Sequence, residues 1–334
     1  MKRFKKRYLL FIPLILVVIA LLGPKVTYDP ITLSKENFTL PIEQLDQFLA
    51  ERAAKVKNLK PENESRIIWA DSVRKTKYSI VYLHGFSAGP MEGDPVHFEL
   101  AKRYGCNLYL ARLAGHGIAD TMSFMHLTPD ELVDDAKEAL DIGHLIGESV
   151  ILMSTSTGGT LSAFLTSKFP ERVAAQLLYS PNFEIYDSNA KHLTGPWGAQ
   201  IARQISGSDY HSFVPPPGGE KYWTTKYRME GVFALQTLLD KTTTPEIFKA
   251  ITKPYFLGYY YKSEEESDKV VSIPAMLEYH KITATPADQK RCMPFPSVGN
   301  HCMISEIQAD DYSKVVEETN KYLEEVLGMK AVGE

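Results

Sequence analysis

A serine at a strand-to-helix junction is the strongest candidate for chemistry in this sequence. The segment SVILMSTSTGGT, residues 149–160, leads from an apolar strand through Ser156 into a stretch that favours a helix. In a nucleophile elbow, small residues two positions before and two positions after the serine let the strand and the helix approach closely. Gly158 meets the second requirement, and Ser154 stands where the pattern has glycine. The pattern predicts Ser156 as a nucleophile, and the alternative is a serine that caps the helix.

A serine nucleophile at neutral pH needs a nearby base and an acid that orients this base. Asp268 follows the apolar strand PYFLGYYY, and His301 lies in the later segment SVGNHCMIS. We expect Asp268 to be the acid, because parallel sheets assemble their sites beyond the carboxyl ends of strands. We expect His301 to be the base, and the alternative is a solvent-exposed loop histidine. The other candidates for the acid are Glu264, Glu265, Glu266 and Asp288.

The segment YLHGFSAGP, residues 82–90, predicts an oxyanion hole. Such a hole needs two backbone N–H donors aimed at the carbonyl oxygen that becomes negative during acyl transfer. Gly85 lets the chain bend so that the N–H of Phe86 points inward, and the N–H of Thr157 is the second expected donor. We interpret His84, and His116 in the Gly-rich segment RLAGHGIAD, as structural residues.

Strands and helices alternate over most of the chain, which predicts a mostly parallel sheet with helices on both faces. The helix from Pro129 to about Leu145 is well marked, because Thr128 can cap it and Glu131 lies three residues after the cap. Residues 66–70 and 78–83 are extended and joined by a polar turn, which predicts a hairpin entering the sheet. The other expected strands are 107–113, 149–154, 173–180, 254–261 and 292–298, and the other helices are 158–168, 273–280 and 312–327.

The alternation stops between residues 182 and 252, in a segment rich in aromatic residues, glycine and proline. We interpret this segment as an insertion that includes a helix over GVFALQTLLDK. Its aromatic and apolar residues predict either an apolar acyl pocket or the core of the insertion itself. These residues are Phe213, Tyr222, Trp223, Phe233 and Leu235.

The first 23 residues have the pattern of an export signal. Five basic residues, Lys2, Arg3, Lys5, Lys6 and Arg7, precede a charge-free stretch from Tyr8 to Gly23. The stretch is shorter than the roughly 20 residues that span a bilayer comfortably, but small residues are missing from the expected cleavage positions. We therefore expect an uncleaved anchor with the rest of the chain outside the cytoplasm, and a secreted or periplasmic protein if the signal is cleaved. Residues 24–64 are expected to form a stalk with a short helix within 41–56.

Composition narrows the possible partners and cofactors. The net charge of −4 over 334 residues provides no excess of positive charge for a nucleic-acid partner. Cys106, Cys292 and Cys302 form no metal-ligand spacing, so we expect no metal. Free thiols are the preferred interpretation, with a Cys292–Cys302 pair left open.

The HGF loop, GHG loop, S-x-S-x-G-G elbow, D-x-V-V turn and G-N-H loop together resemble the α/β-hydrolase family over residues 65–330. Within this family the chain resembles the monoacylglycerol lipase and carboxylesterase branch, often labelled the serine aminopeptidase type. This resemblance implies an α/β-hydrolase core over residues 65–181 and 253–330, with a helical cap over 182–252. It also implies that Ser156 is the nucleophile, Asp268 the acid and His301 the base, with Phe86 and Thr157 as oxyanion donors and no cofactor.

The resulting hypothesis is a serine hydrolase that cleaves small-molecule carboxylic esters, including lipid-like or monoacylglycerol-like esters, through an acyl-enzyme on Ser156. Hydrolysis of amides or peptides is one alternative. A non-catalytic protein that uses the hydrolase fold to bind a ligand, or as a membrane-associated scaffold, is another. The sequence does not fix the oligomeric state.

Overall fold

The computed structural model describes residues 11–34 and 36–333. Its centre is a seven-stranded sheet with the order β1-β3-β2-β4-β5-β8-β9. Strand β1 pairs antiparallel with β3, and the other neighbouring pairs of this sheet are parallel. The predicted mostly parallel sheet is therefore confirmed. The strands are β1 (Arg66–Ile68), β2 (Thr76–Leu83), β3 (Asn107–Leu110), β4 (Gly147–Thr155), β5 (Ala175–Tyr179), β8 (Tyr255–Tyr259) and β9 (Lys290–Pro294).

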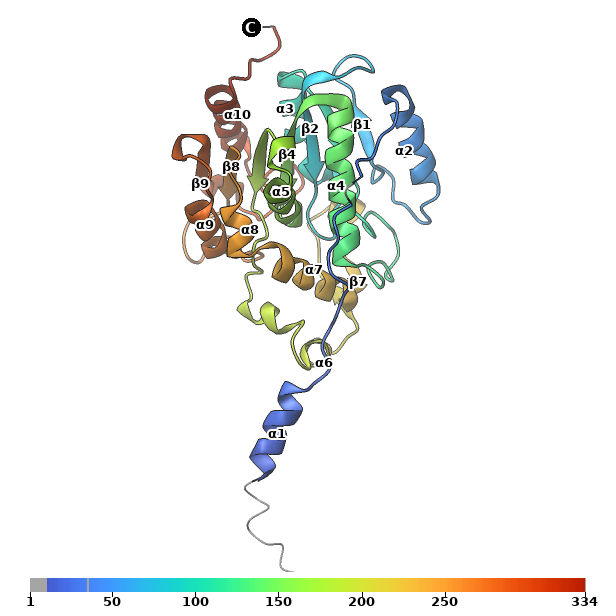
Figure 1. The fold of residues 1–334 in the computed structure, drawn as a ribbon, viewed down its shortest axis with the longest axis vertical. Coiled ribbons are helices and arrows are strands. Elements are labelled where there is room, and N and C mark those ends of the chain that lie inside the picture. The colour runs from blue at the N-terminus through green and yellow to red at the C-terminus, as the bar shows by residue number, and fades with distance from the viewer. Residues whose placement is uncertain (1–10, 35, 334) are drawn as a thin grey trace, which may run out of the picture.

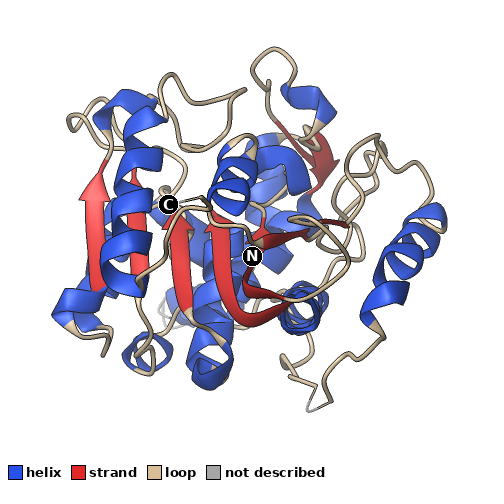
Figure 2. Ribbon diagram, turned by 90° about the horizontal axis from the view of Figure 1, so that it is seen from above, coloured by secondary structure: helices blue, strands red, loops and turns tan. Residues whose placement is uncertain are grey.

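Helices cover both faces of the sheet (Figure 2). Neighbouring strand residues point to opposite faces, so Tyr82 packs in one cluster with α3 and α10, and Val81 packs in another with α4 and α5. The eight-residue helix α3 was not predicted from the sequence, because it is too short for its periodicity to be recognised. The helices are α3 (Val96–Arg103), α4 (Pro129–Ile146), α5 (Thr157–Lys168), α9 (Ile273–Ile282) and α10 (Ser313–Leu327).

The predicted hairpin between residues 66–70 and 78–83 is wrong. Strands β1 and β2 do not pair with each other, because β3 lies between them. The last five residues of β2 are all buried, so this strand needs a hydrogen-bonding partner along each edge. Strands β3 and β4 provide these partners, and the three-residue β1 takes the edge position beyond β3.

The start of α4 has the capping arrangement that its sequence predicts. The Glu131 N–H donates to Thr128 Oγ1 at 3.2 Å, and the Thr128 N–H donates to a Glu131 carboxylate oxygen at 2.9 Å. Pro129 occupies the first helical position, where its missing N–H costs nothing. Local sequence therefore fixes the start of this long helix.

Residues 182–252, called the insertion below, lie between β5 and β8. They form α6 (Gly198–Ser206), β6 (Tyr210–Ser212), β7 (Lys226–Arg228), α7 (Met229–Thr242) and α8 (Pro245–Lys249). Strands β6 and β7 pair with each other in a separate small sheet. Helix α7 packs against α4 and α5, and α6 lies farther from the central sheet (Figure 1).

Helix α1 (Phe11–Leu21) projects from the domain beside α6 (Figure 1). Within residues 11–34 and 36–333, no helix has both the length and the apolar character needed to cross a membrane. The structure therefore does not support the predicted membrane anchor over residues 1–23 with a membrane-spanning helix. Its five basic residues lie outside the described part of the chain.

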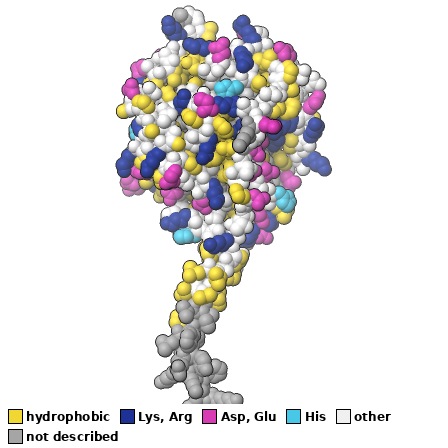
Figure 3. Space-filling model, viewed as in Figure 1, with side chains coloured by type: hydrophobic (Ala, Val, Ile, Leu, Met, Phe, Trp, Pro, Cys, Tyr) yellow, Lys and Arg dark blue, Asp and Glu magenta, His cyan; other side chains and the backbone are white. Residues whose placement is uncertain are grey.

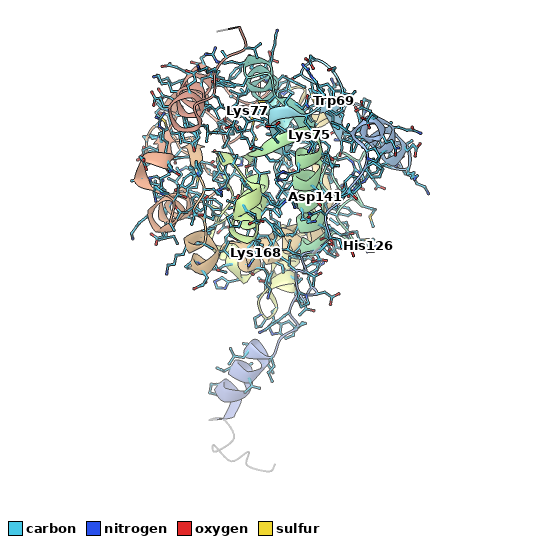
Figure 4. All side chains as sticks on the ribbon, turned by 45° about the horizontal axis from the view of Figure 1, so that its top comes forward. Trp69, Lys75, Lys77, His126, Asp141 and Lys168 are labelled. Atoms are coloured by element: carbon cyan, nitrogen blue, oxygen red, sulfur yellow. The ribbon has the colours of Figure 1, made fainter. Side chains whose placement is uncertain are left out.

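The segment that follows α1 was expected to be a stalk, but it lies along α4 instead (Figure 1). The Phe38 N–H donates to Asp141 Oδ2 at 2.8 Å, and the same carboxylate pairs with Lys137 and Arg172 at 2.8 and 2.7 Å. Asp141 is 2% exposed and lies on α4 (Figure 4). A buried carboxylate with three partners ties the N-terminal segment to the core. The short helix expected within 41–56 is α2 (Leu45–Ala54).

We expect Thr128→Ala to lower the free energy of unfolding by about 1 kcal/mol, because it removes the side-chain acceptor of the Glu131 N–H. Denaturant unfolding followed by circular dichroism measures this change. Thr121→Ala is the matched control, since Thr121 is exposed in a turn. Equal losses in both variants would show that the capping interaction contributes nothing.

Candidate active site

Ser156 lies in a tight turn between β4 and α5. Its backbone angles are φ 52° and ψ −117°, a conformation that is strained for a residue with a side chain. The Ser156 N–H donates to the Tyr179 carbonyl at 3.1 Å, and the Ser156 carbonyl accepts from the N–H groups of Gly159 and Asn182 at 2.8 and 2.9 Å. These bonds hold the turn in the geometry expected for a nucleophile elbow.

Close packing around the turn explains the small residues beside it. A Cβ atom on Gly158 would lie 1.9 Å from the carbonyl oxygen of Leu83, so only glycine fits there. Ser154 is fully buried, and its hydroxyl donates to the Leu177 carbonyl at 3.4 Å. Serine thus replaces the glycine of the usual pattern without leaving its hydroxyl unpaired.

His301 and Asp268 lie together. Nδ1 of His301 is 2.6 Å from Oδ2 of Asp268. The other carboxylate oxygen of Asp268 accepts the N–H groups of Val270 and Val271 at 2.8 and 3.1 Å. Nε2 of His301 is buried and has no hydrogen-bond partner among the described residues, and it belongs to the same cavity wall as Ser156. The arrangement leaves Nε2 free to accept a proton.

The two partners shift each other's pKa in opposite directions. Burial alone would raise the pKa of Asp268, but the charge and hydrogen bond of His301 and the two N–H donors lower it below the ordinary value. Burial alone would lower the pKa of His301, but Asp268, with a contribution from the charge of Glu92, raises it. The fold therefore favours an ionised Asp268 beside an imidazole that gains a proton readily.

The alternative acids lie elsewhere. In the turn after β8, the side chains of Glu264, Glu265 and Glu266 accept hydrogen bonds from their neighbours Tyr261, Ser263 and Lys262, respectively. Asp288 lies in a short 3-10 helix before β9. Among the described residues, Asp268 is the candidate acid that contacts His301.

Phe86 and Thr157, the two expected oxyanion donors, line the same cavity as Ser156. Thr157 is the first residue of α5, where a backbone N–H has no partner within the helix. Gly85 lies close to Ser156, because a Cβ atom on Gly85 would be 3.2 Å from Cβ of Ser156. The loop and the helix N-terminus thus bring both candidate donors to the nucleophile.

Glu92 is a buried carboxylate of this site that the sequence did not single out. It is 2% exposed and lines the cavity. One oxygen accepts the Gly85 N–H at 2.6 Å and the Tyr82 hydroxyl at 3.1 Å, and the other accepts from the Cys302 thiol at 3.8 Å. Burial raises its pKa despite these donors. A glutamate in the segment SAGPMEG carries no sequence signal, because folding alone brings it to the site.

His84 and His116 make contacts of a structural kind. Nε2 of His84 accepts the Leu113 N–H at 3.1 Å, so its Nδ1 is left to donate to the Gly85 carbonyl at 2.8 Å. Burial lowers the pKa of His84 to about 4. His116 packs against it with 5.0 Å between the ring centroids. Both rings therefore support the oxyanion loop as neutral side chains.

The cavity beside Ser156 has a volume of about 520 Å³. Phe213, Trp223 and Leu235 from the insertion contribute to its walls. Tyr222 and Trp223 both pack in the cluster that contains Tyr82, and Phe233 packs in the small cluster with Ala199 and Met229, so these residues contribute to cores as well as to the pocket. Cys302 also lines the cavity, and all three cysteines of the chain are free thiols.

Comparison with known proteins supports the fold. No family model and no curated protein sequence matches the chain. One of two metagenome-derived lipolytic enzymes, LipS and LipT, is similar in structure, with a TM-score of 0.65 and 14% identity over 79% of this chain and 98% of that one. A monoacylglycerol lipase from Paleococcus ferrophilus has a TM-score of 0.54 and 12% identity, covering 77% and 98%. Est1E from Butyrivibrio proteoclasticus, with bound ferulic acid, has a TM-score of 0.55 and 15% identity, covering 79% and 95%. The chain has the fold of the α/β-hydrolases.

We expect Glu92→Gln to raise the free energy of unfolding at neutral pH by roughly 1 kcal/mol, because it removes a buried charge and keeps an acceptor for the Gly85 N–H. The pKa of Glu92 is raised by folding, so its ionisation destabilises the native state as pH rises above the unfolded value. The gain should therefore disappear below the ordinary glutamate pKa of 4.5. Thermal unfolding across pH measures this difference.

Glu99→Gln on the exposed side of α3 is the matched control and should have little effect. A Glu92→Gln variant less stable than the parent at neutral pH would show that the carboxylate is a net stabilising acceptor.

Proposed function

We propose that this protein is a serine hydrolase that cleaves carboxylic esters. The observation that carries the proposal is the free, buried Nε2 of His301 in the cavity wall shared with Ser156, with Nδ1 held at 2.6 Å by Asp268. A neutral imidazole oriented by a carboxylate is the base that a serine nucleophile requires.

In the proposed reaction, Ser156 Oγ attacks the ester carbonyl while His301 Nε2 takes its proton. The N–H groups of Phe86 and Thr157 stabilise the oxygen that becomes negative. The imidazolium then gives its proton to the leaving alcohol, and an acyl-enzyme remains on Ser156. Water attacks this ester by the same route, releasing the acid and restoring the serine. Asp268 stays ionised throughout and stabilises the imidazolium.

The cavity supports an ester with an apolar acyl group. Phe213, Trp223 and Leu235 form apolar walls, and their contact with an acyl chain removes apolar surface from water. The structural neighbours include lipolytic enzymes and a monoacylglycerol lipase, which is consistent with lipid-like esters. We therefore propose lipid-like esters as the substrate class.

Two other functions predict different outcomes. An amide or peptide hydrolase would use the same residues but would turn over amides at rates comparable to matched esters. A non-catalytic ligand-binding protein would neither hydrolyse esters nor react at Ser156. The strained conformation of Ser156 favours a chemical function, since such strain is costly in a residue that only binds.

We expect Ser156→Ala to lower kcat/KM for p-nitrophenyl esters by at least about 10³-fold, because the acyl-enzyme can no longer form. A series of acyl lengths, assayed with the full chain, measures activity and chain preference together. Ser167→Ala on α5 is the matched control, since the Ser167 hydroxyl donates to the Phe164 carbonyl of its own helix. Fluorophosphonate labelling should occur in the parent and be lost in Ser156→Ala. No turnover and no labelling in the parent would exclude the proposal.

The pH profile tests the base. We expect kcat/KM to fall as pH drops through the raised pKa of His301, because only the neutral imidazole accepts the serine proton. Glu92→Gln removes a negative charge that raises this pKa, so the acid limb should move to lower pH. An unchanged acid limb in Glu92→Gln, together with unchanged values for Glu99→Gln, would show that Glu92 does not influence His301.

A further inference from the structure

Helix α6 and its N-cap residue, Trp197, carry an exposed apolar stripe. Trp197, Ile201 and Ile205 are spaced by four residues and are 37%, 54% and 82% exposed. Residues at this spacing lie on one face of a helix. The opposite face is already used, because Ala199 packs with Met229 and Phe233 in a small buried cluster. The side chains of the outer stripe therefore do not belong to the buried cluster on the inner side of α6.

The N-terminal segment is fastened beside this stripe. The Trp197 indole N–H donates to the Ile19 carbonyl, and the Trp197 backbone N–H donates to the Pro24 carbonyl, both at 2.9 Å. Val26 packs against the small cluster beneath α6. Helix α1 thus leaves the domain at the edge of the stripe.

Helix α1 and the residue after it add a second set of exposed apolar side chains. Leu16, Val17, Val18, Ile19, Leu21 and Leu22 are 45% to 78% exposed. Figure 3 shows the yellow side chains of this helix projecting from the body of the protein. Together with Trp197, Ile201 and Ile205, these residues form what we call the apolar surface.

A lipid surface fits the shape and charge of this region better than a second copy of the chain. Helix α1 is described from Phe11 to Leu21, and the exposed side chains described on it are all apolar. Apolar side chains on a projecting helix match the headgroup and acyl boundary, where interfacial helices lie. The five basic residues at positions 2–7 of the sequence would repel a second copy and attract anionic headgroups.

We propose that the apolar surface docks onto a phospholipid bilayer, with α1 and the outer stripe of α6 both in contact with lipid. Docking then involves the insertion itself and does not depend on the N-terminal helix alone. Docking on a bilayer requires no catalytic turnover, so a test of lipid binding is independent of the proposed hydrolase activity.

The test is binding of the full chain to vesicles of phosphatidylcholine, with and without phosphatidylglycerol. We expect Ile201→Ser/Ile205→Ser to lower the partition coefficient about tenfold, because two exposed apolar side chains lose their burial in lipid. Leu277→Ser/Val332→Ser removes apolar side chains that are 45% and 70% exposed outside the apolar surface, and it should bind like the parent. Unchanged binding of the Ile201/Ile205 variant would overturn the proposal.

A second measurement reports on the stripe directly. In a Trp69→Phe/Trp223→Phe variant, Trp197 is the remaining tryptophan, and brominated phospholipids should quench its fluorescence. Absence of quenching in vesicle-bound protein would overturn the proposal. So would sedimentation showing a lipid-free dimer that Ile201→Ser/Ile205→Ser converts to a monomer, because the stripe would then be a contact between copies.

Discussion

The contact between the start of α5 and the end of β2 constrains the rest of the site. Gly158 approaches the Leu83 carbonyl so closely that no side chain is possible, and this approach fixes the turn that holds Ser156 at φ 52°. The neighbouring Gly85 loop comes within reach of Ser156 because the two parallel strands β2 and β4 end side by side. Backbone packing, which is rigid, therefore places Ser156 and the two candidate oxyanion donors, and flexible side chains do not.

The electrostatics of the site involve two buried carboxylates on different elements. Asp268 is held by backbone N–H groups and by His301, so burial does not keep it protonated. Glu92 has donors too, but burial dominates and raises its pKa. Its charge favours a protonated His301 and disfavours the folded state at neutral pH. Buried carboxylates with shifted pKa values are common at functional sites.

The N-terminal segment connects the core to the insertion. It is bound to Asp141 on α4 through Phe38, and to α6 through Trp197. Contacts at both ends fix its path along the domain, so the direction in which α1 leaves is set by the fold. This connection makes α1 and the outer face of α6 one surface, although Trp197 lies 175 positions after Leu22 in the chain.

The sequence by itself determined the features that depend on local pattern. Strand and helix alternation predicted the parallel sheet, the Thr128 cap predicted the start of α4, and the small residues around Ser156 predicted its turn. Tertiary structure alone decided the features that depend on distant partners. These are the position of β1 beyond β3, the arrival of Glu92 beside Gly85, and the packing of residues 24–34 and 36–40 against the core that includes α4. The physical reason is that hydrogen-bond satisfaction and burial are properties of the assembled core, and short stretches of sequence do not encode which distant groups will provide them.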